Sequence, residues 1–130
     1  MIEFVVVGIG GFIGSCMRYL VTRLTRSLML TFPLGTLLSN VTAGLLIGFF
    51  IGIEQNIFQL PPKTKLFLTT GFLGGLSTFS SFSLETVQFF QEGRFAMAAG
   101  NISLNLFLSL AGVVIGMSAS KLLALAKFGK

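Results

Sequence analysis

Four long apolar segments follow one another along the chain, separated by short polar connections. They cover residues 4–22, 34–53, 66–90 and 95–120. Each reaches the roughly 18–20 residues that a helix needs to cross the hydrocarbon core of a bilayer. Together they use nearly the whole length. The pattern therefore predicts an all-α membrane protein with four transmembrane helices in one domain, residues 1–130.

Small and polar residues recur every four positions on two of these segments. On the second segment they are Thr36, Asn40, Gly44, Gly48 and Gly52, and on the fourth they are Asn101, Asn105, Ser109, Gly112 and Gly116. The glycines are expected to let helices approach closely. A membrane-buried amide is costly unless it is hydrogen bonded. The asparagines therefore either bond neighbouring helices or line a polar pathway, and the two stripes can face the same interior.

The third segment is predicted to be a broken helix. Its residues 71–83 contain three glycines and five hydroxyl side chains, with Phe79 and Phe82 three positions apart. Lipid offers no water to freed backbone groups, so a break is tolerated only where protein buries it or where it faces a cavity. We therefore expect the glycine-rich stretch to form a polar site at membrane depth.

Two charged residues lie near the ends of their segments. Arg18 shares a face with Gly10 and Gly14 on the first segment. Its side chain either snorkels to the interface or draws anions toward a vestibule. Glu85 follows Ser77 and Ser81 at helical spacing. This carboxylate either has a functional role or pairs with an arginine at the interface.

Composition excludes several classes of protein. Hydrophobic residues make up 53% of the chain and charged residues 10%, whereas soluble domains carry roughly 25% charged residues. A single cysteine allows no internal disulfide and no zinc or iron–sulfur site built from cysteines. The lack of histidine argues against haem ligation. No nucleophile–base arrangement or nucleotide-binding loop is present, so the chain is not expected to be an enzyme. Its net charge of +5 suits anionic lipid headgroups better than nucleic acid.

Basic residues are divided between the two ends of the predicted bundle. The side with the N-terminus, the middle connection and the C-terminus carries Lys63, Lys65, Lys121, Lys127 and Lys130, and the other side carries Arg23, Arg26 and Arg94, with Arg18 nearby. This bias is weak under the positive-inside rule. It is compatible with insertion in both orientations, as an antiparallel homodimer needs, and also with a cytoplasmic N-terminus.

The interior chemistry points to ion conduction. Hydroxyls, amides and glycines solvate a small ion without holding it tightly, as conduction requires. A phenyl ring has a positive edge, so the edges of Phe79 and Phe82 can stabilise a small anion.

Residues 74–83, Gly-Gly-Leu-Ser-Thr-Phe-Ser-Ser-Phe-Ser, strongly resemble the signature of the CrcB/Fluc family of fluoride channels. Residues 35–40 (Gly-Thr-Leu, then Asn40) and 10–19 (Gly10, Gly11, Gly14, Arg18 and Tyr19) resemble two further family motifs. The resemblance covers the whole chain. It implies passive, fluoride-selective export across the cell (inner or plasma) membrane. It also implies an antiparallel, dual-topology homodimer with two pores.

The resemblance also implies roles for single residues. The fluoride pathway would be lined by Asn40, Phe79, Ser80, Ser81, Phe82, Ser83 and Ser109. Arg18 and Glu85 would lie at its ends. The backbone carbonyls of Gly74 and Ser77 from both subunits would hold a structural sodium ion at the dimer centre. The expected partners are therefore fluoride, a second copy of the chain and the lipid bilayer, with sodium as cofactor.

A small multidrug-resistance-type exporter is the alternative, because such exporters also have four short spans. They resemble one another in having a glutamate deep in the first span. Here the only acid of that span is Glu3, at its edge.

Overall fold

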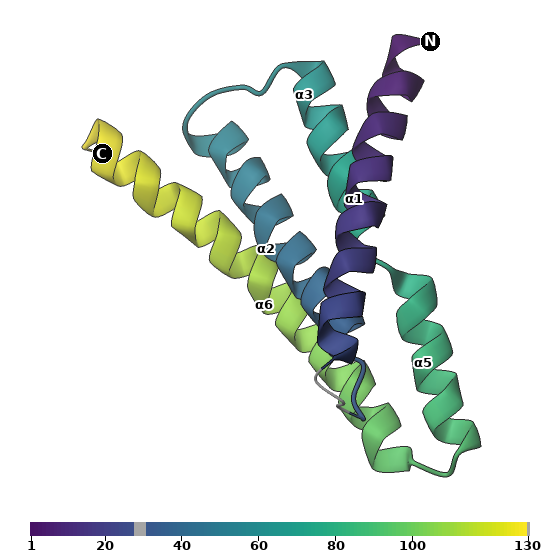
Figure 1. The fold of residues 1–130 in the computed structure, drawn as a ribbon. Coiled ribbons are helices and arrows are strands. Elements are labelled where there is room, and N and C mark those ends of the chain that lie inside the picture. The colour runs from purple at the N-terminus through teal and green to yellow at the C-terminus, as the bar shows by residue number, and fades with distance from the viewer. Residues whose placement is uncertain (28–30, 130) are drawn as a thin grey trace.

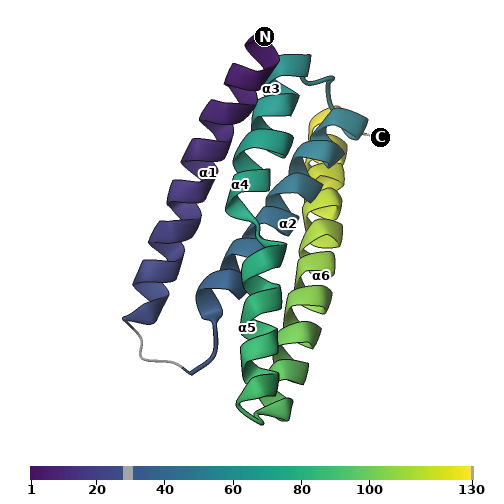
Figure 2. The same ribbon diagram turned by 90° about the vertical axis from the view of Figure 1, so that its right-hand side faces the viewer.

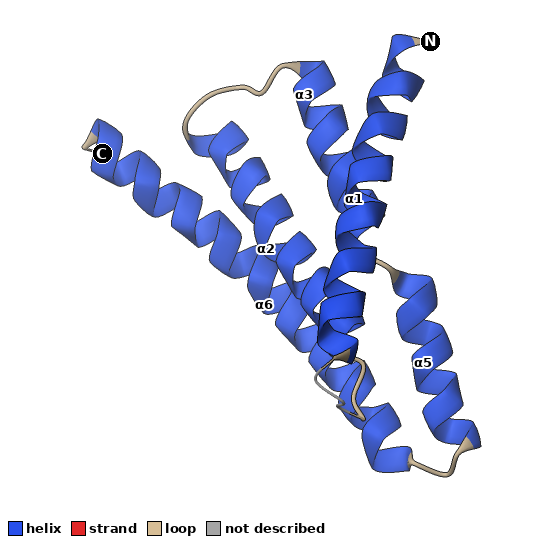
Figure 3. Cartoon of the chain, viewed as in Figure 1, coloured by secondary structure: helices blue, strands red, loops and turns tan. Residues whose placement is uncertain are grey.

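The structure is a computed structural model that describes residues 1–27 and 31–129. Every regular element in this part of the chain is a helix (Figure 3). The elements are α1 (Ile2–Arg26), α2 (Leu34–Asn56), α3 (Pro62–Leu66), the π-helix η1 (Phe67–Leu73), α4 (Gly74–Leu76), α5 (Phe79–Gln91) and α6 (Phe95–Phe128). Among the described residues, α1, α2 and α6 are each long and apolar enough to cross a membrane.

The third rod of the bundle, in chain order, is assembled from several short helices. In Figure 2, α3, η1 and α4 form one continuous piece, and α5 continues from it after a kink. The π-helical turns of η1 are unusual, since π-helices are rare and mostly single-turn insertions. The prediction of an all-helical chain with a broken third segment is therefore confirmed.

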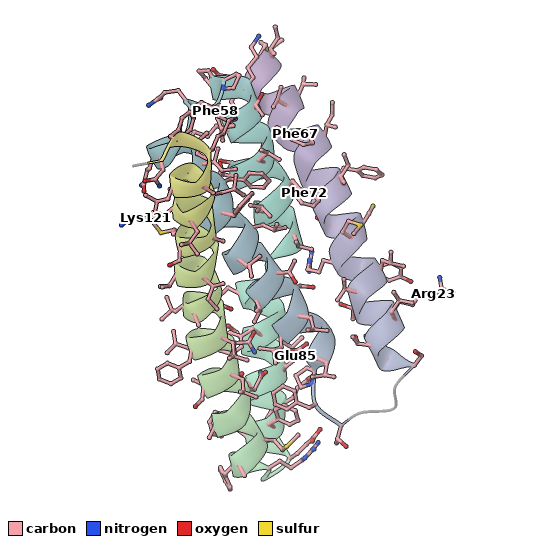
Figure 4. The ribbon with its side chains drawn as sticks, turned by 90° about the vertical axis from the view of Figure 1, so that its left-hand side faces the viewer. Arg23, Phe58, Phe67, Phe72, Glu85 and Lys121 are labelled. Carbon is pink, nitrogen blue, oxygen red and sulfur yellow. The ribbon has the colours of Figure 1, made fainter. Side chains whose placement is uncertain are left out.

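The two ends of the bundle carry the connections that the sequence predicts. Both described chain ends and the α2–α3 connection lie at one end, and the α5–α6 turn lies at the other (Figure 1). Lys121 was counted at the end with the chain termini and Arg23 at the other end. Both side chains point away from the bundle (Figure 4). Lys130, counted in the first group, lies outside the described residues.

Helix α6 is longer than its predicted segment. It has 34 residues, which correspond to about 51 Å at 1.5 Å per residue, against a hydrocarbon core of about 30 Å. It runs past residue 120 to Phe128, where Gly129 adopts φ = 65° and donates its N–H to the Leu125 carbonyl. Glycine at this position ends a helix without steric cost. The last turns of α6 therefore extend beyond what a membrane crossing requires.

Glycines bring α2 and α6 into backbone contact. A Cβ added at Gly44 would lie 2.7 Å from the Ser109 carbonyl oxygen. Similar additions at Gly48 and Gly116 would overlap the carbonyl oxygens of Val113 and Leu45. The stripes of the second and fourth segments thus face each other, and their glycines serve close packing, as predicted.

A second glycine contact joins α1 to the upper part of the third rod. A Cβ at Gly10 would lie 2.7 Å from the Phe67 carbonyl oxygen, and one at Gly75 would lie 2.6 Å from that of Gly11. Gly74 differs from them, because a Cβ there would meet only the Thr69 carbonyl oxygen, at 3.7 Å. One side of α4 is therefore packed against α1, and the Gly74 side is open.

Candidate functional site

The break in the third rod lies at Ser77 and Thr78, whose ψ angles are 156° and 116°. The break lies within the predicted stretch 71–83 but not at its paired glycines, because Gly74 and Gly75 are helical. The reason is that Gly75 is needed for the contact with α1, not for an unusual backbone angle. Thr78 instead starts α5 as its N-cap, and its Oγ1 accepts the Ser81 N–H at 3.2 Å. Threonine is a favoured residue for this role.

Side chains from α1 and α2 satisfy the backbone at the break. In a continuous helix, the Thr78 N–H would bond the Gly74 carbonyl and the Phe79 N–H would bond the Gly75 carbonyl. Here the Thr78 N–H donates to Asn40 Oδ1 at 2.8 Å. The Gly75 carbonyl accepts from Arg18 Nε at 3.1 Å. This contact is neither of the two roles predicted for Arg18, and the vestibule role stays a prediction.

Asn40 contacts three groups around the break. Besides accepting from Thr78, it donates through Nδ2 to Asn105 Oδ1 at 2.9 Å and toward the Thr78 carbonyl at 3.3 Å. The 3.3 Å contact is at the long end of hydrogen-bond geometry. Asn40 therefore bonds a neighbouring helix and at the same time stands at the break.

A cavity of about 600 Å³ lies beside the break. Its walls include six of the residues predicted for the site: Asn40, Gly74, Ser77, Phe79, Phe82 and Ser109. The rings of Phe79 and Phe82 have centroids 5.6 Å apart and are tilted by 54°. The Ser109 hydroxyl is buried without a hydrogen-bond partner among the described residues. The cavity therefore combines two phenyl rings with an uncommitted hydroxyl.

The three other predicted serines lie outside the walls of this cavity as described. Ser81 Oγ accepts from Thr78 Oγ1 at 3.1 Å, and Ser83 Oγ donates to the Phe79 carbonyl at 2.8 Å. Ser80 is exposed, with its hydroxyl 3.3 Å from Thr78 Oγ1. Within one chain, these serines therefore do not line the cavity that Phe79 and Phe82 line.

Glu85 lies at a second cavity, of about 310 Å³, toward the α5–α6 end. Figure 4 shows its side chain inside the bundle between α2 and α5. Its Oε1 accepts from Thr36 Oγ1, whereas its Oε2 is buried without a partner among the described residues. The interpretation that Glu85 pairs with an interfacial arginine is wrong, because Thr36 is its partner. Two arginines line this cavity, Arg26 and Arg94, and Arg94 bonds Glu92 at 3.1 Å.

Sequence reasoning missed Thr86. It is 6% exposed, and its Oγ1 accepts from Asn101 Nδ2 at 2.9 Å. The only signal was its position four residues after Phe82, on the same helical face. Asn101 and Asn105 were expected either to bond helices or to line a pathway. Both bond other side chains, and of the two only Asn105 lies in the wall of the larger cavity.

Four rods of apolar helix, with a largely apolar cavity that carries a few amide and hydroxyl groups beside a helix break, are typical of a small multi-pass membrane protein. The sequence model of the family described as "CrcB-like protein, Camphor Resistance (CrcB)" matches residues 5–117. The chain belongs to this family.

Individual relatives agree with this assignment. The protein named "Fluoride-specific ion channel FluC" from Clostridium novyi (strain NT) is 45% identical over 123 residues, which cover 94% of this chain and 96% of the relative. The protein of the same name from Ruminiclostridium cellulolyticum is 42% identical over 125 residues, which cover 95% and 96%. That from Serratia proteamaculans (strain 568) is 47% identical over 102 residues, which cover 78% and 80%. The relatives bear the name of a channel and not that of an enzyme.

Proposed function

We propose that this protein is a fluoride-selective channel that lets fluoride leave the cytoplasm passively across the cell membrane and so relieves fluoride toxicity. Relatives that align over nearly the whole chain carry the name of a fluoride channel. The observation that carries the proposal is the larger cavity, which gathers Asn40, Phe79, Phe82 and an unpartnered Ser109 hydroxyl. Each of these groups can replace water around a small anion.

The chemistry of the cavity suits an anion that must lose its hydration shell. The Ser109 O–H is a hydrogen-bond donor, and no described group accepts from it. One N–H of Asn40 is held only by the 3.3 Å contact to the Thr78 carbonyl. The Phe79 and Phe82 rings present positive edges. Weak, successive contacts of this kind favour conduction over tight binding. Arg18 and Glu85 would act at the two ends of the pathway.

A second copy of the chain is part of this proposal. The Phe79 side chain is 80% exposed, and the hydroxyls of Ser80 and Ser83 are also outside the cavity. Lipid offers hydroxyl groups no partner. A second copy that covers this surface would bring Ser80, Ser81 and Ser83 to a shared pathway. An antiparallel pair has two equivalent pathways, and the near-balance of basic residues between the bundle ends is compatible with both orientations.

A structural sodium ion fits the backbone of the break. The Thr78 N–H bonds Asn40 and the Ser81 N–H bonds Thr78 Oγ1. In a continuous helix these two N–H groups would bond the carbonyls of Gly74 and Ser77. Because of the break, these N–H groups no longer bond the carbonyls of Gly74 and Ser77. Carbonyl oxygens are ligands for hard cations, so these two could bind sodium. The open side of Gly74 would let the same carbonyls of a second subunit approach. The ion would join the two subunits and would take no part in conduction.

The test is ion efflux from liposomes that contain the purified protein. We expect rapid fluoride loss and negligible chloride loss, measured with ion-selective electrodes on the same preparation, with protein-free liposomes as the control. Equal rates for the two ions would refute selectivity. Proton-coupled export of an organic cation without fluoride loss would instead support the exporter alternative. No described feature favours that alternative, since the only acid of α1, Glu3, lies in its first turn.

A further inference from the structure

A chain of side-chain hydrogen bonds joins the two ends of the α5 turn that carries both phenylalanines. In order from the break, its members are the Thr78 N–H, Asn40, Asn105, Asn101, Thr86 and the Phe82 carbonyl. Every link is 2.8 or 2.9 Å long. We refer to Asn40, Asn105, Asn101 and Thr86 as the amide relay. It passes from α5 through α2 and α6 and back to α5.

The direction of the amide relay is fixed by its ends. A backbone N–H only donates and a backbone carbonyl only accepts. Because the Thr78 N–H donates, Asn40 presents its oxygen there and turns its NH2 toward Asn105. The same argument applies to each amide in turn, until the Thr86 hydroxyl donates to the Phe82 carbonyl. Turning over any one amide would place two donors or two acceptors against each other.

The deeper part of the amide relay is buried and does not line the cavity. Asn101 is 0% exposed, and Asn105 and Thr86 are each 6% exposed. Asn101 and Thr86 are absent from the described cavity wall, whereas Asn40 and Asn105 belong to it. Asn101 and Thr86 can therefore influence an ion only through neighbouring residues, either the other two amides or Phe82, whose carbonyl accepts from Thr86.

We propose that Thr86 and Asn101 are positioning residues for the fluoride pathway, which act by supporting and polarising the Asn105 and Asn40 amides through the relay. This inference rests on the proposed fluoride function. Hydrogen bonds in a chain polarise one another, so Asn40 becomes a stronger donor when its oxygen accepts from Thr78. Its second N–H, held only at 3.3 Å from the Thr78 carbonyl, is the proton that an ion can take over. Without the Thr86 hydroxyl, the Asn101 amide keeps only the 3.5 Å contact to the Phe82 carbonyl. The Asn105 amide is still held by the Asn101 backbone carbonyl, but the side-chain relay ends at Asn101 and polarises Asn40 less.

The test compares two equivalent substitutions. Thr86→Val keeps the shape of the side chain and removes the hydroxyl. Thr25→Val is the matched control, because Thr25 Oγ1 also donates to carbonyls of its own helix, those of Val21 and Thr22, but has no role in the relay. We expect Thr86→Val to lower fluoride flux about tenfold, as for the loss of one buried hydrogen bond, and Thr25→Val to change it less than about twofold. Thr86→Ser, which restores the hydroxyl, is expected to recover the flux.

A second measurement separates this inference from the proposed function. In protein labelled with ¹⁵N-asparagine, Thr86→Val is expected to shift the side-chain NH2 resonances of Asn40 as well as those of Asn101, whereas Thr25→Val shifts neither. Movement of the Asn101 signals alone would overturn the relay, whether or not the protein conducts fluoride. If the wild-type protein is fluoride-selective but Thr86→Val and Thr25→Val have equal flux, the positioning role is wrong and the proposed function stands.

Discussion

Replacing Gly74 with alanine tests whether Gly74 packs against a second subunit, because the substitution is expected to leave the contacts within one subunit intact. Within the subunit, the new methyl group would meet only the Thr69 carbonyl oxygen, at 3.7 Å, which is ordinary contact. Gly74 is helical, with φ = −64° and ψ = −34°, so alanine fits its backbone. Glycine to alanine inside a helix stabilises by roughly 0.5–1 kcal/mol. The folded subunit is therefore expected to be as stable as the wild type, or slightly more stable.

The substitution is expected to weaken association of the dimer, because a second copy would pack against the open side of α4. A methyl group forced into a close contact costs about 1–3 kcal/mol. Two-fold symmetry places the substitution twice in the interface, so the dimer loses about 2–6 kcal/mol. Since 1.4 kcal/mol is a factor of ten, association weakens at least about thirtyfold. Sodium binding by the Gly74 and Ser77 carbonyls is expected to weaken with it.

The assay measures the dimer fraction in detergent against protein concentration, together with thermal unfolding and fluoride efflux. Gly75→Ala is the matched control, since its Cβ would lie 2.6 Å from the Gly11 carbonyl oxygen of the same subunit. It is expected to lower the unfolding temperature, whereas Gly74→Ala is expected to lower the dimer fraction and fluoride efflux. Wild-type association and efflux in Gly74→Ala would refute the placement of Gly74 at a subunit interface.

Three further predictions follow from single contacts. Phe79→Ile and Phe82→Ile are expected to slow fluoride efflux while the dimer persists in gel filtration, because each removes a ring edge from the cavity; unchanged efflux in both variants would remove the rings from the mechanism. Arg18→Met removes the hydrogen bond to the Gly75 carbonyl and is expected to lower the free energy of unfolding by about 1.5–3 kcal/mol, as for a hydrogen bond to a charged group. Unfolding in detergent measures this change, and Arg23→Met at an exposed position is the control expected to have no effect. Ser39→Ala is expected to raise stability by roughly 1 kcal/mol, because the Ser39 hydroxyl is buried without a partner and leaving it unpaired is costly; a loss of stability would reveal an unrecognised hydrogen bond.

Much of the fold was predictable because lipid restricts what a chain can do. Apolar length alone identified α1, α2 and α6, and four-residue spacing identified the faces on which Gly44, Gly48 and Gly116 pack. The position of the break was not predictable in the same way. Glycine is compatible with both a break and a close helix contact, and the sequence does not say which. The contact with α1 decides it, since Gly75 is held helical against Gly11.

The candidate site was predictable as a set of residues but not as a set of contacts. The resemblance named Asn40, Phe79, Phe82 and Ser109, and the structure brings these four to one cavity. The partner of Glu85 was predicted wrongly, because a carboxylate near an interface has arginines within reach and only the packing of α2 shows that Thr36 is nearer. Thr86 was missed because a threonine in a helix normally bonds its own backbone, and nothing local indicates that it also accepts from Asn101.

The groups that satisfy the broken backbone have a definite order along the chain. Arg18 and Asn40, which bond the Gly75 carbonyl and the Thr78 N–H, belong to helices that precede the break, and Asn105 belongs to the helix that follows it. During synthesis, α1 and α2 are therefore complete before the break is made. An unpaired backbone group in hydrocarbon costs several kcal/mol, and here its partners are already present in the nascent chain. Only the hydrogen bond from Asn40 to Asn105 awaits the last helix, so the fold is compatible with insertion one helix at a time.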